Sequence, residues 1–446
     1  MKTVSNPWVD RFNPILDIEA IREKTRLRVA PLSGLNEMPF EEAADRIKDG
    51  WERTYYPTDR NCEILLEVVQ TSASHAVRNH PDKKTHLTLV YASSIDTEPY
   101  VPMMLLGPSG TGKSELGKAL LRLFPKPASI KIDPNHGPFP LIAVSSIVAR
   151  GLNSIVSVLK QLAPDNDEKV SLENLYQLCA RHQYKCGTCC ILVDELQFFT
   201  QSKSANTLVT QLLLGISYVR IPFLVIANYS LAHRLMRRNS EDLQRLIGRP
   251  ITLLPDGPST SDWLTVLNEY QLVVPTVFDF RFSDCALELW SMCAGLKRVL
   301  VRLLVLAYRL TRQAGRFHVA FNDVTLAYVS SSFSGYRSDV EALVLHGIGS
   351  SALRDDLKCP FPLDQSATEK FNLAAKDARE AKVAEAALDA SLTVAERNST
   401  KYIVNTLNSS AGEELPHKVT PKQRSKRETL SPERLNEAGE RFRRGI

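Results

Sequence analysis

The sequence predicts an α/β fold in which a parallel sheet is flanked by helices and followed by a small helical unit. Two observations carry this prediction. Between residues 101 and 257, short apolar segments alternate with longer segments of helical periodicity, which is typical of a parallel sheet with helices on both faces. After residue 257 the periodic segments are helical, without strand signals among them.

The alternation can be followed element by element. Apolar runs predict strands at "PMMLLGPSG", where the strand leads into a turn, and at "ASIKID", "CCILVDE" and "PFLVIAN". Helical spacing predicts helices at "KSELGKALLRLF", "IAVSSIVARGLNSIVSVLKQL" and "ANTLVTQLLLGISYV". A further helix is expected upstream at residues 62–77, and an alanine-rich, charged helix is expected after Pro362.

The composition is that of a globular protein with a sizeable core. Apolar residues make up 43% and charged residues 24% of the 446 positions. The longest apolar runs are too short to span a bilayer, or are interrupted by Arg302. The first residues lack the apolar centre of a secretory signal. We therefore expect a cytoplasmic protein with reduced thiols and no membrane partner.

The positive charge of the chain is concentrated at its carboxyl end. Residues 416–446 hold nine basic and four acidic residues, an excess equal to the net charge of +5 for the whole chain. Such a segment is typical of a flexible arm for acidic partners, either DNA or an acidic protein face. A solvated terminus without a partner is the alternative.

The turn after the first predicted strand has a distinctive glycine-rich sequence. Its sequence, "GPSGTGKS", matches G-x-x-x-x-G-K-[ST] between an apolar strand and an amphipathic helix. In such a loop, backbone N–H groups and the start of the helix face phosphate oxygens. We expect Lys113 to reach the β- and γ-phosphates of ATP and Ser114 to ligate Mg²⁺. The predicted nucleotide-binding residues are Gly107, Pro108, Ser109, Gly110, Thr111, Gly112, Lys113, Ser114 and Glu115.

A second acidic element lies on another predicted strand. "CILVDE" is an apolar run that ends in Asp194 and Glu195. An enzyme that hydrolyses a nucleoside triphosphate in a phosphate loop needs such an element to hold Mg²⁺ and to activate water. We expect Asp194 to bind the metal through its water shell and Glu195 to polarise the attacking water.

The cysteines beside this strand offer a competing interpretation. His182, Cys186 and Cys189 have a spacing compatible with a zinc site, but no second pair of ligands follows nearby in the sequence. Cys190 would point to the opposite face of the strand from Cys189. Buried free thiols at the start of a strand are the favoured interpretation, and the metal site stays as the alternative.

Further polar residues follow in the order that a nucleotide hydrolase requires. Asn228 ends the next predicted strand, where it can hold the attacking water or simply cap the following helix. Five arginines come next, and of these Arg245 and Arg249 directly precede the last apolar strand. An arginine from a neighbouring subunit can stabilise charge at the γ-phosphate, and these two residues are our candidates for that role.

The helical unit contributes cations of its own. Lys297, Arg298 and Arg302 stand at the start of one of its helices, where such a unit would contact the nucleotide. For each of the three a structural role is the favoured interpretation.

This order of elements resembles that of an AAA+ ATPase: phosphate loop, acidic strand, polar-tipped strand, arginines and a small C-terminal helical lid. Within that class, residues 5–360 resemble the TnsC-type transposition regulators, which are relatives of TniB and of the Mu phage B protein. "NPWVDRFNP", "ASIKIDPNHG" and "ILVDELQFF", with Gln197 behind the acidic pair, carry the resemblance. The most specific stretches are "CAGLKRVLVRLLVLAYRLTRQAGRFHVAFNDVTLAYV" and "DVEALVLHGIGSSALRDDL".

The chain departs from the family pattern at three places. Ala227 and Asn228 stand where the family often has a Gly–Thr pair, and Phe198 stands where it has a histidine. Val344 and Leu345 stand where the family has an arginine.

The resemblance implies a protein that binds ATP and hydrolyses it with Mg²⁺. It implies assembly into a ring or filament on double-stranded DNA, with roughly six or seven subunits per ring or turn. Its other implied partners are transposase subunits and a target-selecting protein in the bacterial cytoplasm, with hydrolysis controlling disassembly. DNA contacts in such assemblies go to phosphates, and the candidates here are Lys131, His136 and Arg150.

The resemblance and the periodicity together predict four regions. Residues 1–80 are an N-terminal extension with a helix, and residues 81–257 are the AAA+ P-loop ATPase core. Residues 258–345 are the helical lid, and residues 346–446 are a helix followed by the basic tail.

Two other functions stay open. A STAND-type signalling ATPase would switch protein–protein interactions without DNA, although 446 residues leave no room for the repeat arrays that such chains usually carry. A switch held by ATP without turnover is the other alternative, and Glu195 argues against it.

Overall fold

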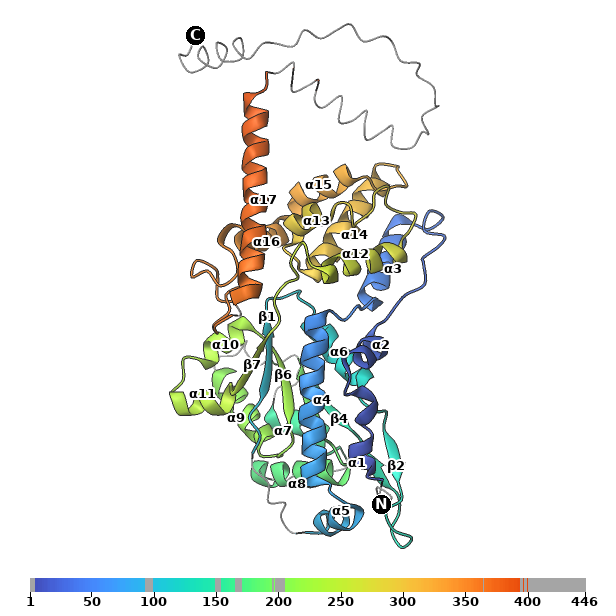
Figure 1. Ribbon diagram of the computed structural model, residues 1–446, viewed down its shortest axis with the longest axis vertical. Helices are drawn as coiled ribbons and strands as arrows, with labels where there is room; N and C mark the ends of the chain where they lie inside the picture. Colours follow the sequence, from blue (N-terminus) through green and yellow to red (C-terminus); the bar gives the residue numbers. More distant parts are fainter. Residues whose placement is uncertain are drawn as a thin grey trace, which may run out of the picture. The chain divides into compact units, whose positions relative to one another are not determined.

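The computed structural model describes residues 5–92, 99–148, 154–164, 171–194, 196, 205–363, 365–393, 396 and 399. The chain divides into two compact units, Met1–Lys382 and Val383–Ile446. The first unit holds the sheet, the helices around it and the lid (Figure 1). Of the second unit, the structure describes the end of helix α17 (Gln365–Ser391) and a few residues after it.

Five parallel strands form the central sheet, in the order β4-β5-β6-β1-β7 (Figure 1). The three central strands are buried along almost their whole length, as strands covered on both faces must be. The neighbours of β1 come much later in the chain, so the loop after β1 lies at a switch point where α/β folds bind ligands. The strands are β1 (Met103–Gly107), β4 (Val144–Val148), β5 (Cys190–Asp194), β6 (Phe223–Asn228) and β7 (Arg249–Thr252).

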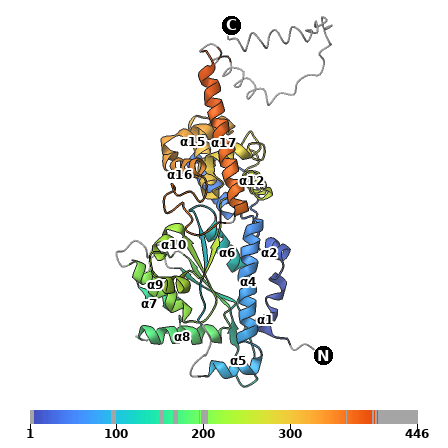
Figure 2. The ribbon, with the colours of Figure 1, turned by 60° about the vertical axis from the view of Figure 1, so that its left-hand side comes forward.

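Alternate residues of these strands face two different cores. Leu105 and Ile226 pack with helices α2 (Ile18–Thr25), α4 (Asp59–Asn79) and α6 (Lys113–Leu123). Leu106 and Val193 face the other core, and Figure 2 shows α9 and α10 on that side of the sheet. The helices of this second side are α7 (Ile155–Leu159), α8 (Leu172–Lys185), α9 (Ala205–Ser217), α10 (Tyr229–Leu235) and α11 (Ser240–Leu246).

The edge strand β4 corrects the sequence interpretation. We expected residues 142–162 to be helical, but Val144–Val148 pairs in parallel with β5. Helical structure in this stretch is confined to α7 and the short turn Lys160–Leu162 among the described residues. The β-branched side chains of Val144, Ile147 and Val148 favour a strand. Because the strand is an edge with two serines, it lacks the continuous apolar run that marked the central strands.

A second difference concerns the segment after α6. Residues 128–130 form a strand as expected, β2 (Ala128–Ile130), but this strand does not join the central sheet. It pairs antiparallel with β3 (Phe139–Leu141) in a separate two-stranded sheet. The first described residues form α1 (Pro7–Asp10) and a 3-10 turn (Asn13–Ile15). Helix α5 (Lys83–Val90) follows α4.

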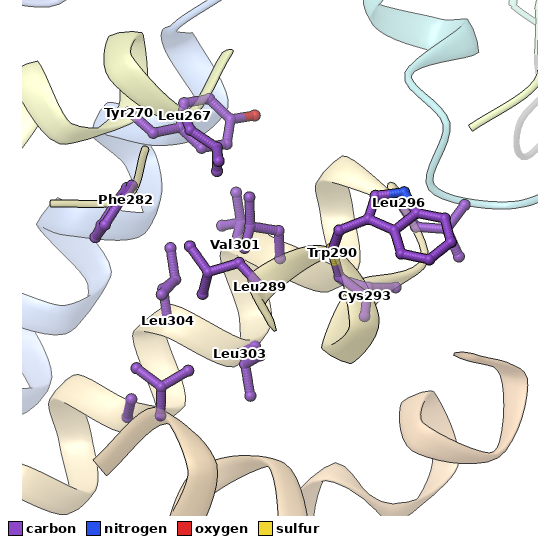
Figure 3. Close-up of a cluster of buried hydrophobic side chains, with 14 of the residues drawn as sticks. Leu267, Tyr270, Phe282, Leu289, Trp290, Cys293, Leu296, Val301, Leu303 and Leu304 are labelled. Carbon is purple, nitrogen blue, oxygen red and sulfur yellow. The ribbon is translucent and has the colours of Figure 1, made fainter. Parts of the chain in front are cut away.

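The lid follows β7 and has its own hydrophobic core. Figure 3 shows side chains of its helices, among them Tyr270, Trp290 and Leu303, converging on that core. The lid helices are α12 (Ser261–Val273), α13 (Ala286–Cys293), α14 (Lys297–Gln313), α15 (Phe321–Val329) and α16 (Ser334–His346), with a 3-10 turn (Ser331–Phe333) before the last.

Two segments from other parts of the chain join the lid core. Helix α3 (Phe40–Arg53) contributes Trp51, and the start of α17 contributes Phe371, whose ring centroid lies 5.1 Å from that of Trp290. Tyr55, only four positions after Trp51, belongs instead to the core of the sheet with α4 and α6. Residues 51–55 therefore connect the two cores.

Among the helices that the structure describes, none has both the length and the apolar content to cross a membrane.

Candidate nucleotide-binding site

A cavity of about 680 Å³ lies where the sheet, the lid and the N-terminal segment meet. The phosphate loop and the start of α6 form one wall, and the ends of β5 and β6 form another. Helices α12 and α14 of the lid and residues 51–56 complete it. Its position at the carboxyl ends of the strands is where an α/β fold binds a ligand.

The phosphate loop takes the backbone conformation that its glycines allow. Gly110 and Gly112 have φ angles of 94° and 97°, in the left-handed region that glycine adopts without strain. The Thr111 hydroxyl donates to the carbonyl oxygen of Pro108 at 3.0 Å and closes the loop. Helix α6 begins at Lys113, so its N–H groups and the positive end of its dipole point toward the loop.

Lys113 is held in the centre of this loop. Its side chain is buried, and its Nζ donates to the carbonyl oxygens of Gly107 at 2.7 Å and Pro108 at 2.8 Å. The pKa of Lys113 is lowered to about 7, mainly by burial and also by the nearby Arg298 charge, while the Asp194 charge acts in the opposite direction. A poorly solvated cation surrounded by carbonyl groups is well placed to bind an anionic phosphate.

Two predicted residues lie at the strand ends beside the loop. Asp194 ends β5, Asn228 ends β6, and both line the cavity with Ser114. Carboxylate and hydroxyl oxygens are the ligands that Mg²⁺ prefers, so Ser114 and Asp194 fit this ion. Asn228 precedes α10, but its side chain makes no capping hydrogen bond with that helix. Glu195 lies outside the described residues.

The lid brings cations to the cavity that the sequence interpretation had considered structural. Arg298 contacts the phosphate loop twice: its backbone N–H donates to the carbonyl oxygen of Gly110 at 3.3 Å, and its Nη1 donates to the Ser109 hydroxyl at 3.3 Å. Lys297 also lines the cavity and pairs with Asp256 at 3.1 Å.

Arg302 lines the same wall, one turn further along α14. Its guanidinium lies 5.2 Å from the ring centroid of Tyr336 on α16. All three cations of this helix that the sequence singled out therefore border the cavity.

The candidate trans-acting arginines lie away from this cavity. Arg249 is at the start of β7 and pairs with Met103 at the start of β1. It therefore lies at the amino ends of these strands, whereas the phosphate loop follows the carboxyl end of β1. It pairs with Glu67 at 2.6 Å, and Arg245 pairs with Glu241 at 3.2 Å. A contact of either arginine with a neighbouring subunit's nucleotide stays a prediction.

The far end of the cavity was not predicted from the sequence. Trp51, Tyr55 and Tyr56 come from the segment that connects the two cores, and Glu269 and Tyr270 come from α12. Aromatic faces of this kind suit a nucleoside. The run "WERTYY" was the only local signal for this wall in the sequence.

The candidate DNA-binding residues are not part of this cavity's lining. Lys131 directly follows β2, and His136 lies in the connection between β2 and β3. The His136 ring centroid is 6.0 Å from that of Tyr91, and its Nδ1 is 3.8 Å from a carboxylate oxygen of Asp133. Arg150 lies outside the described residues.

The cysteines near β5 are buried thiols, as the favoured interpretation of the sequence indicated. The Cys186 Sγ lies 3.6 Å from the Nε2 of His182, and the Cys189 Sγ accepts a hydrogen bond from Arg11 at 3.0 Å. Burial raises the pKa of Cys189 and Cys190, which keeps these thiols protonated. In the described part of the chain, no three His, Cys, Asp or Glu residues are arranged to hold a metal ion.

Comparison with known families agrees with this geometry. A family model described as an AAA domain matches residues 101–235, a stretch that begins just before β1 and ends with α10. This match includes the phosphate loop, Asp194 and Asn228, and it ends before β7 and the lid. The expected P-loop AAA+ fold, with a parallel sheet flanked by helices, is confirmed. The family match and the phosphate loop also support the general expectation that the chain is an ATPase.

Comparison with solved structures finds distant similarities. The Aeropyrum pernix ORC1 protein in complex with DNA is 16% identical, with 59% of this chain and 66% of that chain covered and a TM-score of 0.37. Cdc6p from Pyrobaculum aerophilum is 10% identical, with 76% and 98% covered and a TM-score of 0.40. The Thermotoga maritima RuvB branch migration motor is 11% identical, with 70% and 87% covered and a TM-score of 0.34. No curated protein matches the chain.

Proposed function

We propose that the chain is an ATP-dependent, DNA-binding AAA+ regulator of DNA transposition. It would assemble on double-stranded target DNA, pass the selected site to a transposase, and disassemble when ATP is hydrolysed. The ATPase part of this proposal rests on the contacts around the phosphate loop. Lys113 donates a hydrogen bond within the loop, and Arg298 of the lid contacts Ser109 and Gly110.

The roles in nucleotide binding follow from the positions of these side chains. Lys113 binds the β- and γ-phosphates, helped by the amides at the start of α6. Ser114 and Asp194 hold Mg²⁺, which supplies charge neutralisation at the phosphates when bound. Arg298 lies against the loop and joins the lid to the same phosphates.

Hydrolysis adds residues whose roles rest on their place in the sequence. Glu195, directly after β5, activates the attacking water, and Asn228 orients it from the end of β6. Arg245 or Arg249 reaches the γ-phosphate of a neighbouring subunit in the assembly. Because this arginine comes from a second subunit, hydrolysis depends on assembly of the oligomer.

The transposition part rests on the resemblance of residues 5–360 to TnsC-type regulators. Lys131, His136 and Arg150 are the proposed phosphate-backbone contacts on DNA, and the basic tail of residues 416–446 supplies a further positive segment. Such contacts bind DNA without reading its sequence, so target choice would come from the partner protein.

The test combines hydrolysis and negative-stain imaging of the full chain with ATP and Mg²⁺, with and without double-stranded DNA. We expect ordered rings or filaments only when ATP and DNA are both present, with a hydrolysis rate that changes with DNA. Hydrolysis indifferent to DNA, with no ordered assembly, would contradict the proposal and favour an AAA+ ATPase that acts on a protein partner.

A charge reversal sharpens the DNA arm of this test. Lys131→Glu is expected to weaken DNA binding and to reduce the slope of log K against log salt by about one unit, because one phosphate contact is lost. Lys376→Glu on α17 is the matched control, since Lys376 is exposed and pairs with Glu380 at 3.7 Å. Equal effects of both reversals would remove Lys131 from the DNA-binding surface.

A further inference from the structure

The cavity continues beyond the phosphate loop to an end whose chemistry the proposed function leaves open. It passes Glu115 and Lys118 on the first turns of α6. Arg122, one turn further along this helix, lies 5.3 Å from the ring centroid of Tyr55. Tyr55 and Glu269 line the cavity at this end. A nucleotide whose phosphates lie in the loop and whose base and sugar fill the rest of this cavity would contact these residues.

Two carboxylates line this end, and their surroundings differ. The Glu52 side chain is 54% exposed and lies 3.7 Å from Lys48. The Glu269 side chain, on α12, is only 6% exposed. Burying an ionised carboxylate is unfavourable unless it is paired and hydrogen-bonded, so Glu269 depends on its partners.

Arg26 and Arg28 of the N-terminal segment are those partners. Arg28 donates from Nη2 to Oε1 at 2.8 Å and from Nε to Oε2 at 3.0 Å, and Arg26 also donates to Oε1. Leu27, between them, exchanges two backbone hydrogen bonds with Tyr55, at 2.8 and 3.0 Å. This short ladder fixes both arginines beside the cavity wall.

These contacts keep Glu269 ionised. Burial alone would raise its pKa, but the hydrogen bonds from Arg28 and Arg26 outweigh burial and hold the pKa of the carboxyl below its ordinary value. The wall at this end therefore contains an ionised carboxylate. Its ion-pair partners, Arg26 and Arg28, are not part of the cavity lining.

The arginines occupy the two oxygens of Glu269 unequally. Oε1 accepts from both arginines, whereas Oε2 accepts from the Arg28 Nε among the residues that the structure describes. A carboxylate oxygen can accept about two hydrogen bonds, so Oε2 keeps one acceptor position. One acceptor position suits a single N–H donor and not the pair of adjacent donors that guanine presents. Hypoxanthine has a single donor, N1–H, but a carbonyl oxygen in place of the adenine amino group at C6.

We propose that Glu269 Oε2 accepts a hydrogen bond from the amino group of adenine and so selects adenine nucleotides over guanine and hypoxanthine nucleotides. Adenine has an amino group at C6, where guanine and hypoxanthine have a carbonyl oxygen. That oxygen would meet the carboxylate lone pairs without a proton between them, which is unfavourable in a buried site. This inference rests on the proposed nucleotide-binding function.

The test is competitive binding of adenosine, inosine and guanosine diphosphates to the full chain. The wild-type chain is expected to bind the adenosine form at least about tenfold more tightly than the inosine form, because a hydrogen bond to a charged group is replaced by repulsion. Glu269→Gln, whose amide can accept or donate, is expected to narrow this difference to less than about threefold. Glu63→Gln is the matched control, because Glu63 is an exposed carboxylate on α4 that pairs with Arg60 and is not in the cavity lining; it is expected to keep the full difference.

A second variant covers the case in which Glu269→Gln does not fold. Glu269→Asp keeps the charge for the arginines but withdraws the oxygens from the cavity by about one bond length, and it is expected to lose most of the discrimination. Circular dichroism melting curves establish which variants are folded.

Several outcomes would overturn the assignment. Equal binding of the adenosine and inosine forms by the wild-type chain rejects it without any variant. Full discrimination in a folded Glu269→Gln or Glu269→Asp chain also rejects it. A penalty for 2′-deoxyadenosine diphosphate that disappears in Glu269→Gln would assign the carboxylate to the sugar instead. Failure to bind any nucleotide would contradict the proposed function itself, which keeps the two failures distinguishable.

Discussion

The two ends of the cavity are built in opposite ways. The phosphate end comes mainly from the contiguous stretch 109–115, together with the ends of two neighbouring strands. The other end comes from the N-terminal segment and the lid, where Arg28 and Glu269 meet across 241 positions of the sequence. At the phosphate end the lid adds Arg298 to a loop that is contiguous in the sequence, whereas the nucleoside end is formed only where the lid and the N-terminal segment pack together.

The largest effect is expected at the phosphate end. Lys113→Ala removes the buried cation and should weaken ATP binding by about a hundredfold or more, since a charged hydrogen-bonding group is lost from a site with little water. Calorimetric titration of the full chain measures this. Lys118→Ala is the control, because Lys118 also lines the cavity but is 64% exposed and pairs with Glu115 at 2.7 Å. Similar losses in both variants would contradict a special role for Lys113.

The second prediction separates hydrolysis from binding. Glu195→Gln is expected to slow ATP hydrolysis by roughly 10²- to 10⁴-fold, the usual contribution of a general base, while nucleotide affinity stays unchanged. The ATP-bound assembly should then persist on DNA, which sedimentation and imaging can detect. Identical behaviour of Glu195→Gln and Lys113→Ala would show that the division of roles between them is wrong.

The lid's contribution is expected to be smaller. Arg298→Ala removes the side chain that contacts Ser109 and should weaken ATP binding about tenfold, because one charged hydrogen bond is lost. Arg309→Ala on the same helix is the control, since Arg309 pairs with Glu41 and Asp45, each at 2.9 Å, on α3. If affinity measured by titration is unchanged in Arg298→Ala, the lid does not contribute to phosphate binding.

The same contrast explains what the sequence could predict. The phosphate loop, Asp194 and Asn228 could be predicted because each lies at the carboxyl end of an apolar strand, and parallel strands bring these ends together on one side of the sheet. Strand β4 was not predicted, because it is an edge strand in which Ser145 and Ser146 interrupt the apolar pattern. The role of Glu269 could not be predicted from the sequence either, because its partners are brought to it by tertiary packing and not by spacing along α12.

The charge of Lys113 gives a pH-dependent way to sharpen the comparison. Burial lowers its pKa from 10.5 to about 7 in the chain without nucleotide, so the amine is mostly neutral at pH 8. Phosphate favours the charged form, so binding at pH 8 should take up about one proton, and affinity should fall as the pH rises above 7. Calorimetry in two buffers with different ionisation enthalpies measures this uptake.

The same shift affects the stability of the chain without nucleotide. The folded pKa of Lys113 is below the unfolded value, so the unfolded chain binds more protons between about pH 7 and 10.5. The contribution of Lys113 to the free energy of unfolding therefore rises with pH across this window. Equal proton uptake at pH 6 and pH 8 on nucleotide binding would contradict both expectations.

The smallest effect concerns the connection between the two cores. Trp51→Phe removes the hydrogen bond from the Trp51 Nε1 to the carbonyl oxygen of Tyr270, which is 2.8 Å long. Loss of this bond should lower the free energy of unfolding by about 1 kcal/mol, measured by denaturant titration. An unchanged midpoint would show that this contact does not stabilise the packing of α3 against α12.

Amide hydrogen exchange of the full chain, with and without a non-hydrolysable ATP analogue and Mg²⁺, tests the central claim most directly. The claim is that one nucleotide occupies both ends of the cavity. Nucleotide binding is expected to slow exchange at the phosphate loop, at residues 54–56 and at the adjoining turns of α12 and α14, because ordering the lid reduces local opening. Slowing confined to residues 107–115 would contradict the account, since the lid and the N-terminal segment would then take no part in the site.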